Sequence, residues 1–140
     1  MFNPVPEETL QMALAGVRTD HPRVIATSER AAAVRAAAAA SPAGRLADAA
    51  VVEARAVLGL APLRYGKEGR RLLHVSREAL RRLALFGVAW FRTGDSRFVR
   101  RAEAELAAVC AFPDWNPSHY LDVAEMSLAV ALAYDWMHGG

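Results

Sequence analysis

The sequence is poor in cysteine, because Cys110 is the only one among its 140 residues. A single cysteine excludes an intrachain disulfide and any metal cluster built from several cysteine ligands. We expect Cys110 to serve as a small core residue, since unpaired cysteines are mostly buried. The sequence also contains no phosphate-cradling glycine loop and no two-histidine metal helix, so neither a cofactor nor a metal is expected.

The sequence also lacks a large charge of either sign and a long apolar run. Lysines and arginines number 17 against 15 acidic residues, which leaves a formal charge of +2. So small an excess is not typical of a dedicated nucleic-acid-binding protein. No window approaches the roughly 20 apolar residues of a membrane span. The beginning, "MFNPVPEETLQMALAG", lacks the basic head and apolar stretch of a secretory signal. We therefore expect neither nucleic acid nor a membrane as a partner.

The charge is unevenly distributed. Between residues 63 and 82 there are seven basic and two acidic side chains, so this stretch carries +5 and the remainder −3. One interpretation is a solvated loop followed by the polar face of a helix. The other is a basic patch that attracts an anionic ligand such as an acidic sugar polymer.

Helical patterns cover most of the chain, and no segment shows the alternation of a strand. Ser41 followed by Pro42 predicts a helix start, while Ser76 and Ser96 are predicted to cap two later helices. The predicted helices span about residues 7–16, 29–40, 42–58, 77–92, 97–112 and 121–137.

The helices 77–92 and 97–112 are joined only by a "TGD" turn and are therefore expected to lie antiparallel. In the first helix, an outward polar face is predicted for Arg77, Glu78, Arg81 and Arg82. In the second helix, Arg101 and Glu105 are four positions apart, which predicts a modest surface pair. Its predicted inner stripe consists of Phe98, Ala102, Leu106, Val109 and Cys110.

The last helix, 121–137, differs from the others because apolar residues occupy nearly all of its sides. A helix of this kind belongs inside a larger structure. Amphipathic helices followed by a wholly apolar one are typical of layered helical hairpins, so an all-α fold is predicted. If nothing further covers residues 121–137, they expose an apolar face and favour self-association.

The stretch "FPDWNPSHYLDVAEM" is unusually polar for this chain. Asp122 and Glu125 share one helix face, but two acids in a first helical turn are also what the helix dipole favours, and we prefer that interpretation to a catalytic pair. Asn116 and His119 can either bind a ligand or brace a corner between helices. Trp115 can stack on a sugar ring or pack between helices, as can the neighbouring tyrosine.

Several motifs resemble those of the heparinase II/III-like polysaccharide lyases. "HPRVIATSERAAAVRA" is similar to the opening of their helical region, where His-Pro-Arg leads into the first capped helix. The runs "SREAL", "TGDSRF", "FPDWNPSH", "LDVAEM" and "AYDW" follow in that family's order and spacing. The resemblance covers residues 21–136, and the combination is more specific than any one of its pieces.

This resemblance implies an all-α fold of antiparallel helical hairpins that form the start of an incomplete (α/α) toroid. Residues 1–20 would be an N-terminal extension, and residues 21–140 the first segment of a truncated toroid domain. The family cleaves uronic-acid-containing polysaccharides, such as heparan sulfate or alginate, by β-elimination. Its members are often periplasmic.

The motif-matched residues are Trp115, Asn116 and His119, which the resemblance places in the lining of a cleft for an acidic polysaccharide. The family's catalytic tyrosine and histidine have no match in this sequence, so no catalytic residue is assigned and no turnover is expected of this chain alone. The alternative is a small α-helical carbohydrate-binding or scaffold domain without catalysis.

Overall fold

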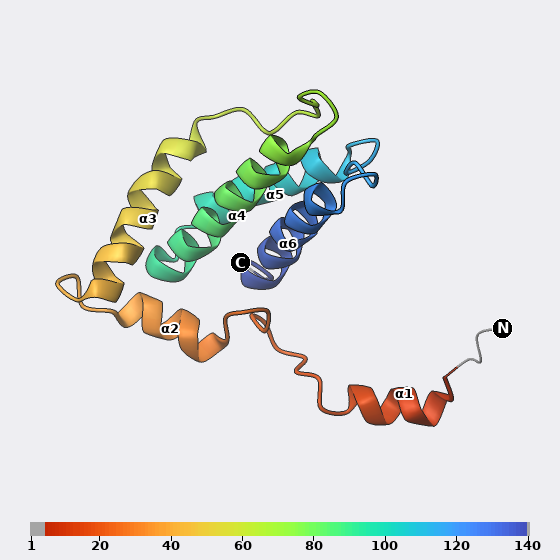
Figure 1. Ribbon diagram of the computed structural model, residues 1–140. Coiled ribbons are helices and arrows are strands. Elements are labelled where there is room, and N and C mark those ends of the chain that lie inside the picture. The colour runs from red at the N-terminus through yellow and green to blue at the C-terminus, as the bar shows by residue number, and fades with distance from the viewer. Residues whose placement is uncertain (1–4, 140) are drawn as a thin grey trace.

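The computed structural model describes residues 5–139, and this part of the chain is all helical (Figure 1). An isolated bridge between Glu68 and Arg71 is the only extended pairing within it. None of its helices is long and apolar enough to cross a membrane. The six helices are α1 (Glu7–Leu14), α2 (Ser28–Ala36), α3 (Pro42–Leu58), α4 (Leu73–Thr93), α5 (Ser96–Cys110) and α6 (Tyr120–Trp136).

Helix α4 is the centre of the fold, because α2, α3, α5 and α6 all pack against it. Its side chains Ala79, Leu83 and Phe86 are fully buried. The α4–α5 connection turns at Gly94, whose left-handed backbone ends α4, and Asp95 caps α5. The two helices run antiparallel, as the short turn predicted (Figure 1).

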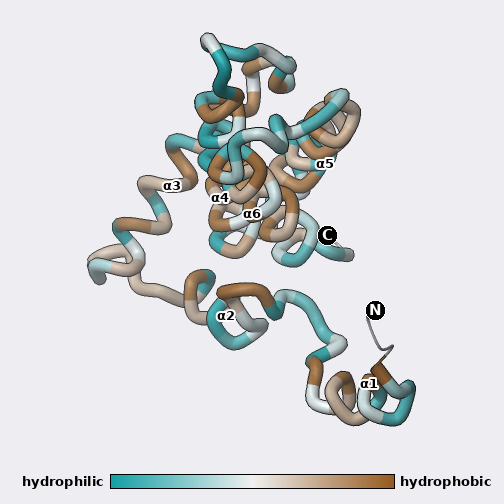
Figure 2. Tube along the Cα trace, turned by 45° about the vertical axis from the view of Figure 1, so that its right-hand side comes forward, coloured by the Kyte–Doolittle hydropathy of each residue, from teal (hydrophilic) through white to brown (hydrophobic). Residues whose placement is uncertain are grey.

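Helix α6 makes the most extensive contact with α4. The close approach occurs at Gly87, where a Cβ atom would lie 2.5 Å from Cε3 of Trp136. Figure 2 shows hydrophobic positions recurring along α4, α5 and α6. One face of α6 is left uncovered, however, because Leu121, Leu128 and Tyr134 are 47%, 39% and 59% exposed.

Helix α1 lies apart from the other helices (Figure 1) and has no buried side chain. It makes no packing contact with any of α2 to α6. The helical body is therefore formed by the residues from His21 onward.

The end of α2 and the start of α4 differ most from the predicted helix boundaries. Helix α2 ends at Ala36 instead of continuing to position 40, because Arg92 of α4 donates through Nη1 to the carbonyls of Val34, Arg35 and Ala37. Helix α4 begins at Leu73, so Ser76 is a buried residue inside the helix and not its cap.

The predicted exposure of several α4 and α5 residues was also wrong. Cys110 is exposed, and not part of the inner stripe. Glu105 is completely buried, and the residue Arg82 is only 8% exposed. Glu105 lies on the same face of α5 as the buried Phe98, Ala102 and Val109, where Arg82 binds its carboxylate. The cap of α5 is Asp95, one residue before the predicted Ser96.

Candidate functional site

The three residues predicted to line a cleft lie together at the corner between α5 and α6. Trp115 packs against the hydrophobic core and donates through Nε1 to the carbonyl of Val109 at 2.9 Å. Asn116 adopts a left-handed backbone with φ of 59°. Its N–H donates to the Asp114 carboxylate at 2.8 Å, which fixes the turn. His119 precedes the first residue of α6.

The side chain of Asn116 braces this corner. The residue is 1% exposed, and its Nδ2 donates to Asp122 Oδ2 at 2.7 Å and to the carbonyl of Arg70 at 2.9 Å. His119 Nδ1 lies 3.3 Å from Asn116 Nδ2 and 3.0 Å from Ser118 Oγ. Of the three residues predicted to contact a ligand, the half-buried Trp115 and His119 can therefore do so. Asn116 could contact a ligand only if its hydrogen bonds to Asp122 and Arg70 were broken.

Asp122 is the acceptor at the centre of the corner, and its carboxylate is fully buried. Arg71 donates to Oδ1 through Nε at 3.0 Å and Nη2 at 2.7 Å, and the backbone N–H of Leu72 donates to Oδ2 at 2.7 Å. Arg71 holds the pKa of Asp122 far below its usual value despite burial, with help from Asn116 and Leu72. Asp122 thus fastens the loop before α4 to the start of α6.

This arrangement separates Asp122 from Glu125, which instead pairs with Arg77 at 3.2 Å. The two acids do not form a catalytic pair, because the Asp122 carboxylate is buried and bonded on both oxygens. The sequence placed Asp122 in a first helical turn correctly. Its partner Arg71 is 51 positions away, and helix periodicity carries no signal of such a contact.

Glu105 binds a second loop in the same manner. Its Oε2 accepts from the backbone N–H of Leu63 at 2.9 Å, while Oε1 accepts from Arg82 at 2.7 Å and Arg101 at 2.8 Å. Arg82 and Arg101 also donate to loop carbonyls, those of Ala61 and Leu60 respectively.

Asp135 binds a third segment near the end of α6. Its Oδ2 accepts from the backbone N–H groups of Arg23 and Val24, both at 2.7 Å, and its Oδ1 lies 2.7 Å from His21 Nδ1. Burial raises the pKa of Asp135. The backbone and imidazole hydrogen bonds lower it by more, so the pKa of Asp135 is below its usual value. The segment preceding α2 is thereby attached to α6.

The loop between α3 and α4 places basic residues beside the corner. The Tyr65 hydroxyl donates to the carboxylate of Asp114 at 3.2 Å, and the carbonyl of Arg70 accepts a hydrogen bond from Nδ2 of Asn116. Among residues 5–139, no acidic group lies within ion-pair distance of Arg64, Lys67 or Arg70, whereas Arg71 is paired with Asp122. We call the following set the corner surface: Arg64, Lys67, Arg70, Trp115 and His119.

A hollow of about 300 Å³ adjoins the corner surface at Trp115. Phe112, Pro117 and Val123 give it an apolar lining, and the carboxylate of Asp114 lies at its side. Its lining is mostly apolar, and Asp114 is the one charged residue among the side chains that border it.

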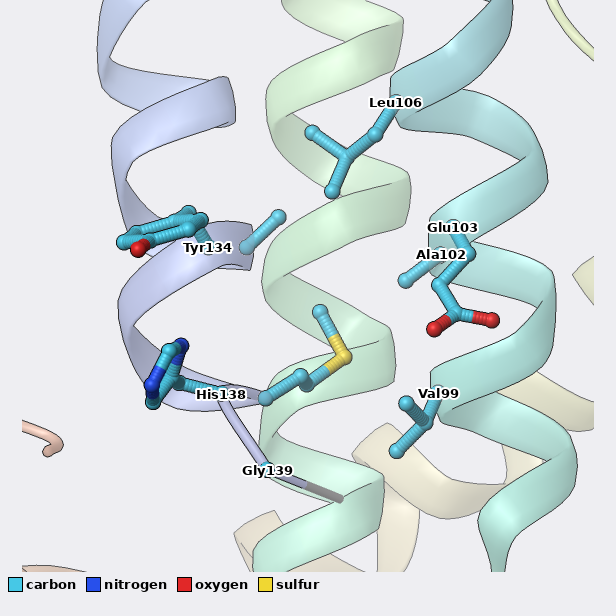
Figure 3. A pocket seen from close by; sticks show the side chains of 9 residues that line it. Val99, Ala102, Glu103, Leu106, Tyr134, His138 and Gly139 are labelled. Atoms are coloured by element: carbon cyan, nitrogen blue, oxygen red, sulfur yellow. The ribbon is translucent and has the colours of Figure 1, made fainter.

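A separate groove of about 200 Å³ lies between α5 and α6. Figure 3 shows Glu103 and Leu106 on α5 opposite Tyr134 on α6 and His138 just after it, with α4 behind them. Its polar groups are too few and too scattered for a metal. Throughout the described part of the chain, no three histidine, cysteine or acidic residues are grouped as metal ligands.

No model of a known protein family matches this sequence, and no curated protein matches it at a significant level. The function is therefore argued from the residues and their geometry.

Proposed function

We propose that this chain is the N-terminal helical part of a heparinase II/III-like lyase domain, where it begins an (α/α) toroid and binds a uronic-acid-containing polysaccharide without supplying the catalytic groups. The helical hairpins around α4 support the toroid, and the corner surface supports the acidic ligand.

One observation carries the proposal: the motifs behind the resemblance bind one another in space. His21 of "HPR" meets Asp135 of "AYDW", although 114 positions separate them. Asn116 of "FPDWNPSH" meets Asp122 of "LDVAEM" at 2.7 Å. These contacts support the proposal because they give residues of the matched motifs a shared part in holding the helices together.

The chemistry of β-elimination explains why this part alone is expected to be inactive. A base must remove the C5 proton of the uronic acid, and donors must neutralise the charge that develops on its carboxylate. At the corner, Asp122 and Asn116 are buried and bonded to each other. The half-buried Trp115 and His119 are suited to stack on a sugar and donate to it, and the basic loop attracts its charge.

The alternative function is a small carbohydrate-binding or scaffold domain without catalysis. This alternative is favoured because all residues of the corner surface come from this chain, where the loop between α3 and α4 contacts the turn before α6. The toroid proposal is favoured by the uncovered face of α6, which suits a further helical hairpin. A reading frame that continues past Gly140 into asparagine, histidine and tyrosine motifs would favour the toroid.

The test is calorimetric titration of the protein with alginate and heparan sulfate oligosaccharides, with uncharged cello-oligosaccharides as the neutral control. We expect binding of the acidic chains that weakens with added salt. The double variant Lys67→Gln, Arg70→Gln should weaken it roughly tenfold, in line with two lost charged contacts. The matched control Arg55→Gln, which removes an exposed cation from α3, should leave it unchanged.

Turnover is measured in parallel from the ultraviolet absorbance of unsaturated uronates, and none is expected. Equal binding of acidic and neutral chains, or an unaffected double variant, would contradict the corner surface as the binding site. Product formation by the isolated chain would contradict the absence of catalytic groups.

A further inference from the structure

His21 is held in one orientation by a buried carboxylate. Because the ionised Asp135 accepts hydrogen bonds only, the Nδ1 of His21 at 2.7 Å must carry the proton of this bond. The other oxygen of Asp135 is occupied by two backbone N–H groups. The ring nitrogen Nε2 is left without a partner among residues 5–139, and the side chain keeps 14% of its surface exposed.

The ring of His21 faces a cavity of about 330 Å³ bordered by α2, α4 and the end of α6. This volume is within the range of small-molecule sites. Two indole rings, Trp90 and Trp136, and the ring of Phe91 form much of its wall. Trp136 is fixed by the bond from its Nε1 to the carbonyl of Val24 at 2.8 Å.

Arg35 supplies a positioned positive charge in this cavity. Its Nε donates to the carbonyl of Phe91 at 3.1 Å and its Nη2 to that of Trp90 at 3.4 Å. These bonds lie along one edge of the guanidinium, so Nη1 remains available to another acceptor. Among the described residues, no carboxylate lies within ion-pair distance of Arg35. A held guanidinium next to aromatic walls suits an anion attached to a ring.

We propose that this cavity binds a small ring-bearing carboxylate, with the ring between the tryptophan side chains, the carboxylate at Arg35 and a polar group at Nε2 of His21. The site is independent of the proposed function, since it lies at the end of α6 opposite the corner surface. Two sources share this chemistry: a free uronic acid, whose ring is a sugar, and an aromatic acid.

The test is an NMR titration of the full chain with glucuronate and with benzoate, each compared with a neutral counterpart, glucose or benzyl alcohol. The indole N–H signals of Trp90 and Trp136 and the ring signals of His21 should shift in a saturable manner. The signal of Trp115, which lies at the corner, serves as an internal control. Saturation by glucuronate alone identifies a sugar acid, and saturation by benzoate alone an aromatic acid.

Variants test the two polar groups. Arg35→Gln should weaken binding tenfold or more, Arg35→Lys should restore part of it, and Arg55→Gln should have no effect. His21→Asn places an amide N–H where Nδ1 stands, which keeps the bond to Asp135 but removes Nε2, and it should weaken binding less than Arg35→Gln. Circular dichroism confirms that each variant is folded.

The proposal is overturned if neither acid produces saturable shifts at the two indoles, or if the neutral counterparts produce the same shifts. It is also overturned if folded Arg35→Gln protein binds as tightly as the unmodified chain. Shifts confined to Trp115 would locate binding at the corner surface instead, and would support the proposed function while refuting this cavity.

Discussion

Arg82 and Glu105 form a buried ion pair with 2.7 Å between Nη1 and Oε1. Both residues also bind the backbone of the loop that follows α3, at Ala61 and Leu63. The pair therefore joins α4, α5 and this loop at one point. A charge pair in such a position is costly to break, because the remaining charge stays buried.

Glu105→Gln should destabilise the protein by about 3 kcal/mol, since it leaves Arg82 and Arg101 without their shared buried charge. Urea unfolding followed by circular dichroism measures this loss. The control is Glu103→Gln, which removes the same charge from an exposed position on the same helix and should change stability by less than about 0.5 kcal/mol. Equal effects of the two variants would show that the buried pair is not important for stability.

The sequence predicted the Glu105 contact with Arg101 but not its environment. An i,i+4 spacing is visible in any helix, and it indicates that two side chains can meet. It does not reveal that Arg82, 23 positions earlier, turns the same carboxylate inward. Arg82 was assigned to an outward face for the same reason. Burial of a charged residue depends on partners from other helices, which periodicity within one helix cannot identify.

Stability should fall in acid partly through Asp122. Its pKa is lower in the folded protein than the usual 3.8, mainly because Arg71 donates to it. A depressed pKa means that folding favours the ionised form, so its contribution is complete above about pH 5 and is lost as the pH falls below about 4. Glu78, with its pKa lowered to about 2 mainly by Arg81, acts in the same window.

Asp122→Asn should therefore narrow the difference in urea midpoint between pH 6 and pH 3. The remaining dependence would arise from Glu78 and the other acids, and Glu103→Gln provides the comparison for the loss of an exposed acid. If Asp122→Asn keeps the same difference between the two pH values as the unmodified chain, the contact with Arg71 does not contribute to acid sensitivity.

Gly87→Ala should destabilise the packing of α4 against α6 by about 1–2 kcal/mol. The added Cβ atom meets the ring of Trp136, whose Nε1 is bound to Val24, and this overpacking outweighs the gain in helix propensity. The matched control is Gly59→Ala at the end of α3, where no atom lies within 4 Å and the backbone φ is −83°. That variant should be neutral or slightly stabilising. Thermal unfolding compares them, and a stabilised Gly87→Ala protein would refute the tight contact.

Self-association should occur through the uncovered face of α6. Light scattering over a range of concentrations should show oligomers for the unmodified chain, and Leu128→Glu should reduce them, since a charge on this face opposes burial. Leu46→Glu is the control, because Leu46 is 74% exposed on α3, away from that face. A monomer at all concentrations would contradict this prediction, as would equal effects of the two variants.

The sequence predicted local features well and distant ones poorly. The bounds of α3, Pro42–Leu58, were correct because Ser41 and Pro42 act within one turn of the helix start. The start of α4 was wrong because Leu72 is fixed by Asp122 from another part of the chain. At the candidate site, the sequence grouped Trp115, Asn116 and His119 correctly, since they are close neighbours. It identified the basic stretch but not its place beside these residues, and it missed the cavity at His21, because both depend on contacts between segments distant in sequence.

Asp122, Asp135 and Glu105 each hold a segment by its backbone N–H groups. A backbone donor is present whatever side chain it carries, except in proline. Substitutions at Val24, Leu63 or Leu72 therefore leave these particular bonds intact, whereas a change at any of the three acids removes them. The backbone part of each attachment is thus specified by the acidic residue alone, so relatives that differ at Val24, Leu63 or Leu72 can keep these bonds as long as the three acids are retained.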